Sequence, residues 1–292
     1  MGVDLESLRC FDAAATTLHF RAAAGRVHLS PAAFSDRLQR LEKELGAKLF
    51  HRTSRRVALT DAGHRLAPEA RRLLEETSAL RALVRGDRSP PPFELVVGTR
   101  YELGLSWLCP SLVRLERARP ERTIHLYNAD TPDLLARLER GDVDAIVTSA
   151  RLTSARLAYA SLHVEDYVFV GTARGVRGPA DARSLVLVDV TADLPLFRYL
   201  LDALPDTTPW PFHRVEYMGG IGAIRQRVLV GGRVAVLPRY FVRADLHARR
   251  LVALLPRVRP SSDTFRLVYR AGHPRAAELV KLAAELRAIP LR

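Results

Sequence analysis

Basic side chains gather between residues 48 and 56 of this 292-residue chain, and their spacing suits the binding of a polyanion. Lys48, His51, Arg52, Arg55 and Arg56 fall within nine residues, with no Asp or Glu among them. Cationic groups at this density neutralise successive phosphates of a nucleic acid backbone. A charge run is also what a solvated face looks like, so the interpretation depends on the elements that position these side chains.

Two helical patterns come just before the basic run, on either side of a tight break at residues 28–30. Their apolar positions are Phe20, Ala23, Ala24 and Val27 in the first, and Phe34, Leu38, Leu41 and Leu45 in the second. Ser30 can cap the second helix by accepting a backbone N–H, and Pro31 suits its first position, where a missing N–H costs nothing. Gly46 ends the helix. The pattern therefore predicts a helix-turn-helix.

The second helix of this motif presents small and polar side chains on its outward face, which permits close approach to a major groove. Two strands around Thr53 and Ser54 would form a wing whose arginines reach phosphates or a minor groove. The candidate DNA-binding residues are Ser30, Ala32, Ala33, Ser35, Asp36, Gln39, Arg40, Lys43, Arg52, Thr53, Arg55 and Arg56. Helix-turn-helix shapes also occur in proteins that never touch DNA, so the pattern alone leaves both interpretations open.

From Leu5 to Gly63 the chain resembles the amino-terminal domain of LysR-type transcriptional regulators. The resemblance lies in the segments LRCFDAAATTLHFRAAA, LSPAAFSDRLQRLEKELGAKLFHRT and VALTDAG. It implies a sequence-specific DNA-binding regulator with a winged helix-turn-helix. The family more often has Gln and then Pro after the capping serine, where this chain has Pro31 and Ala32, and a polar residue where Asp36 stands. These departures concern the base contacts and leave the docking mode unchanged.

A length of 292 residues predicts two or three domains. The composition is that of an ordinary globular protein, since 48% of the residues are hydrophobic and 26% are charged. The net charge of +13 favours polyanionic partners. Residues 1–92 hold 16 basic and 11 acidic residues, a net charge of +5, and the rest of the chain carries the remaining +8. The net charges of the two parts therefore do not single out the amino-terminal region as the one that binds a polyanion. The cluster of basic residues between 48 and 56 does.

The two cysteines, Cys10 and Cys109, are predicted to lie in different domains, so we expect no structural disulfide and a reducing compartment. No basic and then apolar leader opens the chain, because Asp4 and Glu6 interrupt it. No run approaches the roughly 18 apolar residues that a membrane span needs. We therefore expect a cytoplasmic protein that does not contact a membrane.

Residues 60–84 read as one long helix with an apolar seam typical of a coiled coil. The seam consists of Leu66, Ala70, Leu73, Thr77, Leu80 and Val84. The alternative is an amphipathic helix that lies on its own domain. The LysR-type resemblance favours a dimerisation helix, and the family commonly pairs its dimers into tetramers. A homodimer would place two recognition helices on the half-sites of an interrupted palindrome. Residues 85–92 are charged and rich in Pro, and we interpret them as a hinge linker. The expected order is therefore a winged helix-turn-helix domain at residues 1–59, the helix at 60–84 and then this linker.

Strand and helix patterns alternate from residue 93 to 148 and again from 184 to 237, which predicts two α/β units with parallel sheets. The candidate crossings between the units are residues 167–171 and 265–269, with a returning helix at 274–289. The expected division of residues 93–292 is subdomain I, 93–170 and 265–292, and subdomain II, 171–264. The arrangement resembles the effector domain of LysR-type regulators, which is itself similar to periplasmic binding proteins. The resemblance to the effector domain is clearest in the segments DLLARLERGDVDAIV and VLVGGRVAVLPRYFV.

A small-molecule effector would bind between these units, because ligands of open α/β sheets lie outside the carboxyl ends of the strands. This rule nominates Thr99, Arg100, Tyr101, Asn128, Thr131, Thr148, Ser149, Asp189, Thr191, Met218, Gly219, Gly220 and Pro238. Arg100 beside a helix amino terminus would suit a carboxylate, and Asp189 near it would complete a recognition pair for a zwitterion. The sequence favours equally the alternative that Arg100 is a solvated surface arginine. The glycine run at 219–222 is too short to argue for a nucleotide site.

Catalytic motifs do not emerge from the sequence. The nine histidines are scattered without metal-ligand spacing, and no Walker-type loop or nucleophile elbow occurs. We therefore expect no enzyme activity, metal or cofactor. The expected partners are double-stranded DNA, a small-molecule effector, further copies of the chain and RNA polymerase. Two alternatives stay open: a carboxyl-terminal domain that binds a protein without any effector, and an enzyme with an appended DNA-binding module.

Overall fold

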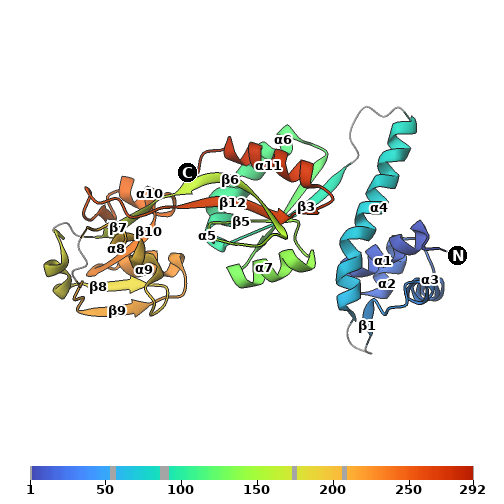
Figure 1. The fold of residues 1–292 in the computed structure, drawn as a ribbon, viewed down its shortest axis with the longest axis horizontal. Coiled ribbons are helices and arrows are strands. Elements are labelled where there is room, and N and C mark those ends of the chain that lie inside the picture. Colours follow the sequence, from blue (N-terminus) through green and yellow to red (C-terminus); the bar gives the residue numbers. More distant parts are fainter. Residues whose placement is uncertain (1, 53–56, 86–91, 173–175, 206–208, 292) are drawn as a thin grey trace.

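A computed structural model of the protein describes residues 2–52, 57–85, 92–172, 176–205 and 209–291. Three bodies follow one another along the molecule (Figure 1). A small helical domain and the long helix α4 lie at one end, a first α/β unit lies in the middle, and a second α/β unit lies at the far end. In the part of the chain that is described, no helix combines the length and apolar character needed to cross a membrane.

The predicted winged helix-turn-helix is confirmed in the amino-terminal domain. Its elements are α1 (Leu5–Thr17), α2 (Phe20–Arg26), α3 (Pro31–Glu44), β1 (Phe50–Arg52) and β2 (Val57–Leu59). The Ser30 hydroxyl accepts a hydrogen bond of 3.3 Å from the backbone N–H of Ala33, and Gly46 follows α3 with a φ of +65°. Phe34, Leu38 and Leu41 are buried as expected, whereas Leu45, the last apolar position, stays 39% exposed because it is already the C-cap.

Helix α4 (Asp61–Arg85) matches the predicted helix but divides its apolar seam between two environments. Ala70 is fully buried and Leu66 packs against the same core as α1, so Ala70 is not available to a second chain. Leu73, Leu80 and Val84 are 38%, 62% and 87% exposed. The first half of α4 thus completes the helix-turn-helix core, as the alternative interpretation has it, and only the second half presents an unpartnered apolar row.

The first α/β unit is built on a five-stranded sheet in the order β4-β3-β5-β12-β6. Its strands are β3 (Phe93–Thr99), β4 (Arg122–Asn128), β5 (Ala145–Thr148), β6 (Leu157–Glu165) and β12 (Asp263–Arg270). β4, β3 and β5 are parallel, and β12 runs antiparallel to β5 and β6. One face packs against α6 (Cys109–Ala118) and α11 (Ala276–Arg287), and the other against α7 (Thr131–Arg140). A short helix α5 (Tyr101–Leu103) and a π-helical turn (Gly104–Leu108) lead from β3 into α6.

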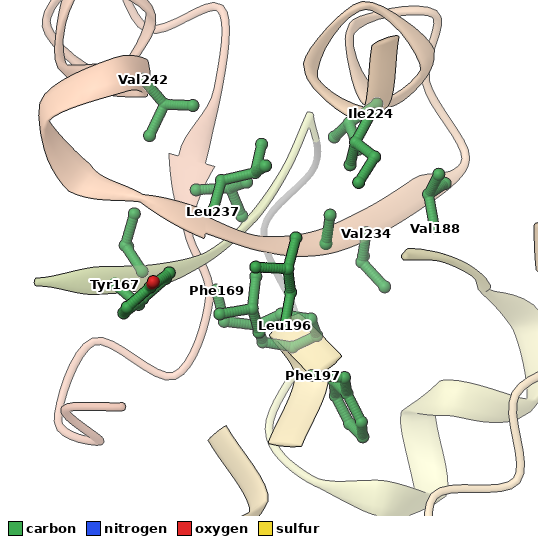
Figure 2. Packing of buried hydrophobic residues seen from close by; sticks show 14 of the residues in the cluster. Tyr167, Phe169, Val188, Leu196, Phe197, Ile224, Val234, Leu237 and Val242 are labelled. Carbon is green, nitrogen blue, oxygen red and sulfur yellow. The ribbon is translucent and has the colours of Figure 1, made fainter. Parts of the chain in front are cut away.

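The second α/β unit has the sheet order β11-β7-β10-β8-β9. Its elements are β7 (Tyr167–Gly171), the 3₁₀ turn Pro179–Ser184, β8 (Val186–Asp189), α8 (Pro195–Leu201), β9 (Arg214–Tyr217), α9 (Ile221–Leu229), β10 (Arg233–Pro238), α10 (Arg239–His247) and β11 (Val252–Ala253). Figure 2 shows Ile224 and Val242 on one side of this sheet and Leu196 and Phe197 on the other, all within one buried apolar cluster. Helices therefore cover both faces of this mixed sheet, in which β8, β9 and β10 are parallel and β7 is antiparallel to β10 and β11.

The crossings between the units differ from the expected ones. Residues 167–171 are not a crossing but strand β7, which pairs antiparallel with β10 in the second sheet. Residues 265–269 are likewise part of β12. The chain crosses at Asp166, between β6 and β7, and returns between β11 and β12. The expected end of subdomain I at residue 170 would assign β7 to the wrong sheet. The segment VEDYVFV does not predict a turn between the units, because β6 and β7 belong to different sheets but are separated by one residue.

Candidate functional site

The outward face of α3 is open along its whole length. Ala32, Ala33, Asp36, Gln39, Arg40 and Lys43 are exposed, Ser35 is half-buried, and the capping Ser30 is exposed just before them. Asp36 and Arg40 form an ion pair across one turn of the helix. This pair occupies one arginine of the face, whereas the exposed Gln39 beside it forms no side-chain hydrogen bond with any residue that the structure describes.

The hairpin next to α3 is fixed by aromatic packing. The Phe50 ring lies 5.5 Å from the ring of Phe11 and 5.3 Å from that of Phe20, so β1 is joined to the helical core. Lys48 donates a 3.0 Å hydrogen bond to the buried carboxylate of Glu42, which partly offsets its charge, although the Lys48 side chain remains 76% exposed. The Arg52 backbone belongs to β1, while Thr53, Arg55 and Arg56 lie outside the described residues, as does the side chain of Arg52.

A cavity of about 600 Å³ opens between the two α/β units, at the carboxyl ends of β3, β5 and β8. Four of the nominated residues line it, namely Arg100, Thr131, Thr148 and Ser149. The second unit contributes residues that sequence reasoning missed, among them Tyr167, Arg198, Tyr199 and Asp202, and Arg151 and Asp263 complete the wall. The strand-end rule therefore located the cleft but found only its half on the first unit.

Arg100 is held in place at this cavity by Glu165. Its Nη2 donates a 3.1 Å hydrogen bond to Oε1 of Glu165, and a longer one of 3.4 Å to the Ser149 hydroxyl. The Glu165 side chain is fully buried, and its Oε2 has no hydrogen-bond partner among the described residues. Burial is the largest effect and by itself would lower the pKa of the Arg100 guanidinium, but Glu165, Tyr240 and Tyr167 together outweigh it, and the pKa is raised. Arg100 is thus an oriented cation and not a solvated surface group.

An aromatic pair forms the opposite wall of the cavity. The rings of Tyr167 and Tyr199 are stacked, with centroids 4.0 Å apart. The Tyr199 hydroxyl donates a hydrogen bond to Asp263, which also forms an ion pair of 3.3 Å with Arg151. Burial, followed by the hydrogen bond to Asp263, raises the pKa of Tyr199 to about 12, so this hydroxyl stays protonated and can donate. The cavity therefore combines flat apolar surface with oriented polar groups.

Asp189 does not pair with Arg100, so the expected recognition pair was wrong. Its buried carboxylate accepts hydrogen bonds from the backbone N–H groups of Val190, Leu196 and Phe197, at 2.6, 3.2 and 2.8 Å. Burial raises the pKa of this carboxyl, and the three N–H groups oppose that rise. Asp189 thus serves the start of α8 in its own unit, and Glu165 supplies the acid that faces Arg100.

The other nominated residues do not line the cavity: Thr99, Tyr101, Asn128, Thr191, Met218, Gly219, Gly220 and Pro238. Thr99 is buried and donates to the Val147 carbonyl at 3.1 Å. The start of α9, which follows the glycine run, is occupied by a carboxylate of the chain itself, since Oε1 of Glu102 accepts a 3.2 Å hydrogen bond from the Gly222 N–H. This hydrogen bond joins the two units at the start of α9.

Comparison with known proteins gives two family matches that together span nearly the whole chain. Residues 5–64 match the model of the bacterial regulatory helix-turn-helix proteins of the lysR family, and residues 88–288 match that of the LysR substrate binding domain. A probable hydrogen peroxide-inducible genes activator of Streptomyces viridosporus is 30% identical over 97% of this chain and 93% of its own length.

Solved structures share the fold over the full length. A cysteine-to-aspartate variant of full-length OxyR from Pseudomonas aeruginosa superposes with a TM-score of 0.70 at 23% identity, covering 100% of this chain and 97% of the other. Full-length LysG from Corynebacterium glutamicum, with its bound effector Arg, gives a TM-score of 0.65 at 21% identity, covering 98% of both chains. At sequence identities of 23% and 21%, this structural similarity shows that the chain has the same fold, and nothing beyond the fold.

Proposed function

This chain belongs to the LysR family of DNA-binding transcriptional regulators, and from that premise we propose that its effector is a small organic acid bound between the two α/β units. The observation that carries the proposal is Arg100, an arginine oriented by a buried carboxylate at the wall of a 600 Å³ cavity. A guanidinium fixed in this way has donors left for a carboxylate of a ligand. We further propose that the protein regulates without catalysing a reaction.

The residues around Arg100 support an acid with a flat or branched body. Thr148 and Ser149 place hydroxyl groups at the end of β5, on the same wall as Arg100. Tyr167 and Tyr199 offer a stacked aromatic surface opposite. Asp202 and Asp263 add acids that can receive an ammonium group, so an amino acid fits the charge pattern as well as a simple carboxylate does. The related fold of LysG, solved with Arg as its effector, accommodates a ligand of this class.

Peroxide is the second candidate signal, because the relative from Streptomyces viridosporus is named as a hydrogen peroxide-inducible activator. Only two cysteines occur in this chain, and they lie in α1 and at the start of α6. Cys10 is buried, and burial raises the pKa of its thiol, which disfavours the reactive thiolate. Cys109 is exposed but has no second cysteine in its own domain. We therefore favour an organic acid over thiol oxidation.

On the DNA side, we propose that α3 enters the major groove with Gln39 reading bases, and that the wing arginines contact phosphates. The open face of α3 and the aromatic anchoring of β1 support this arrangement. Binding of the effector would favour one relative orientation of the two α/β units, and so bias how a dimer presents its two α3 helices. Pairing into tetramers, contact with RNA polymerase and a cytoplasmic location stay predictions.

Titration calorimetry of the full chain tests the effector proposal. The probes are amino acids, dicarboxylates and aromatic acids, each at constant ionic strength. Arg100→Lys keeps a cation opposite Glu165 but removes the guanidinium fork, so it should weaken the binding of an acid by about tenfold, the value of one charged hydrogen bond. Arg117→Lys, at an exposed position of α6, is the matched control. Equal affinity in both variants would mean that Arg100 does not hold the acid, and no binding of any probe would favour the protein-partner alternative.

A further inference from the structure

A second cavity, of about 440 Å³, lies at the crossing between the two α/β units and shares no lining residue with the cleft described above. His163 on β6 and Arg287 at the end of α11 line it from the first unit. Arg239 and Arg243 on α10 line it from the second unit. The cavity is therefore formed by both units, as the cleft is, but from different elements.

Positive charge dominates the lining. Arg239 and Arg243 are exposed and stand one helical turn apart, which places both guanidinium groups on the same side of α10. In the described part of the chain neither side chain forms a hydrogen bond or an ion pair. Arg287 donates from Nε and Nη2 to the Ser161 carbonyl at 3.0 and 2.7 Å, which fixes its plane and leaves Nη1 free to donate. Asp166 is the one acid among the lining residues.

Two further side chains give the cavity a defined shape. The His163 ring lies edge-on to Trp107, with centroids 5.3 Å apart, and its Nε2 lies 3.3 Å from the Leu286 carbonyl, so the ring is oriented. Tyr240 lines the cavity, and its buried hydroxyl has no hydrogen-bond partner among the described residues.

We propose that this cavity is a second effector site, which binds a small organic polyanion carrying two or more carboxylate or phosphate groups. One anionic group would lie between Arg239 and Arg243, and another would reach Arg287. Three arginines against one aspartate match a ligand with at least two negative charges, since guanidinium groups bind such oxyanions through paired N–H donors.

Binding here would act on the same conformational equilibrium as binding in the cleft. A ligand held by Arg287 on one side and by Arg243 on the other bridges the two units next to the crossing at Asp166. The two sites are also in physical contact, since Tyr240 packs against Phe265 with centroids 5.8 Å apart, and the Arg100 guanidinium lies 6.0 Å from the same ring. The protein would therefore combine two metabolite signals in one rearrangement.

Calorimetry with citrate and with pyrophosphate, on the full chain at fixed ionic strength, tests the proposal. Arg243→Gln and Arg239→Gln should each weaken binding of the preferred probe about tenfold. Asp166→Asn should strengthen it, because the one repelling carboxylate is removed. Arg117→Gln, which lowers the charge of the same domain by one, should leave it unchanged.

Several results would overturn the proposal. One is the absence of saturable binding with both probes at millimolar concentration. Another is a larger loss of affinity in Arg100→Lys than in Arg243→Gln, which would place the anion in the cleft. Equal loss in Arg117→Gln and in Arg243→Gln would mean that only the overall charge attracts the anion. A drop in DNA affinity in Arg239→Gln and Arg243→Gln, without any binding of small anions, would assign these arginines to DNA instead.

Discussion

Arg100 Nη2 and Glu165 Oε1 lie 3.1 Å apart, although the two residues are 65 positions apart in the chain. Arg100 follows the last residue of β3, and Glu165 is the last residue of β6, directly before the chain crosses into the second unit at Asp166. A ligand bound by the Arg100 guanidinium would therefore be connected to the crossing through the Glu165 carboxylate. Through this contact, binding in the cleft would influence the relative orientation of the two units.

The Arg100–Glu165 pair should behave as a buried ion pair in a double-mutant cycle. Arg100→Met leaves a fully buried carboxylate without its partner, and should cost about 3–5 kcal/mol of stability. Adding Glu165→Gln removes the buried charge and should recover a large share of that loss. Urea unfolding of the four proteins, followed by circular dichroism, measures the coupling. Strictly additive losses would mean that the two side chains do not stabilise each other.

The α3 face and the wing should contribute to DNA binding in different ways. Gln39→Ala should change the preference among binding sites with little effect on the salt dependence. Arg52→Ala or Arg55→Ala should weaken binding to all sequences and reduce the slope of log affinity against log salt by about 1. Fluorescence anisotropy over a salt series measures both quantities. An unchanged slope in both arginine variants would contradict the wing prediction.

The exposed half of α4 should hold a dimer together. Leu80 is 62% exposed on the apolar row, so Leu80→Asp should shift the protein from dimer towards monomer while leaving it folded. Ser78→Asp, exposed on the same helix but outside the row, is the control and should keep the dimer. Sedimentation velocity gives the masses. Ala70→Asp should instead unfold the amino-terminal domain, because Ala70 is buried in that domain's own core.

Glu216 should make the second unit sensitive to acid. Hydrogen bonds from Arg227 at 2.7 Å and Arg233 at 3.1 Å lower the pKa of this carboxyl from its ordinary 4.5 to about 2. A lowered pKa means that the ionised form stabilises the fold; this contribution is complete above 4.5 and is lost as the pH falls towards 2.

The test is the difference in thermal midpoint between the wild type and Glu216→Gln. The variant should be less stable at pH 7, and the gap should narrow as the pH falls below the ordinary pKa of 4.5. Glu116→Gln, at an exposed position of α6, should show no gap at any pH. A gap for Glu216→Gln that stays constant with pH would mean that its charge does not matter.

Thiol oxidation should not switch the protein. Hydrogen peroxide should leave the DNA affinity of the wild type and of Cys109→Ser equal, because Cys109 has no second cysteine in its own domain. Mass spectrometry under native conditions should detect no intramolecular disulfide. Formation of a Cys10–Cys109 disulfide that changes operator affinity would refute the organic-acid proposal in favour of peroxide sensing.

Several local features of the fold could be predicted because their causes lie within a few residues. Ser30 and Pro31 mark the start of α3, and Gly46 marks its end. The alternation of strands and helices predicted for residues 93–148 and 184–237 is present in the structure, whereas the sequence did not indicate β6, α10 or β11. Helical and strand periodicity, capping and turn chemistry act over one or two turns, so a single chain displays them directly.

The pairing of distant groups could not be predicted in the same way. Asp189 and Glu165 are both acids at strand ends, and nothing in the neighbouring residues says which of them meets Arg100. The sheets decide it, because Asp189 turns into its own unit to bind three backbone N–H groups, while β6, which is antiparallel to β12 and so runs in the same direction as β3, ends with Glu165 at the sheet edge where Arg100 follows β3. The sequence alone determined the elements and the family, since these follow from local patterns. Tertiary packing decided which charges meet, because desolvation and partner geometry exist only once the sheets are assembled.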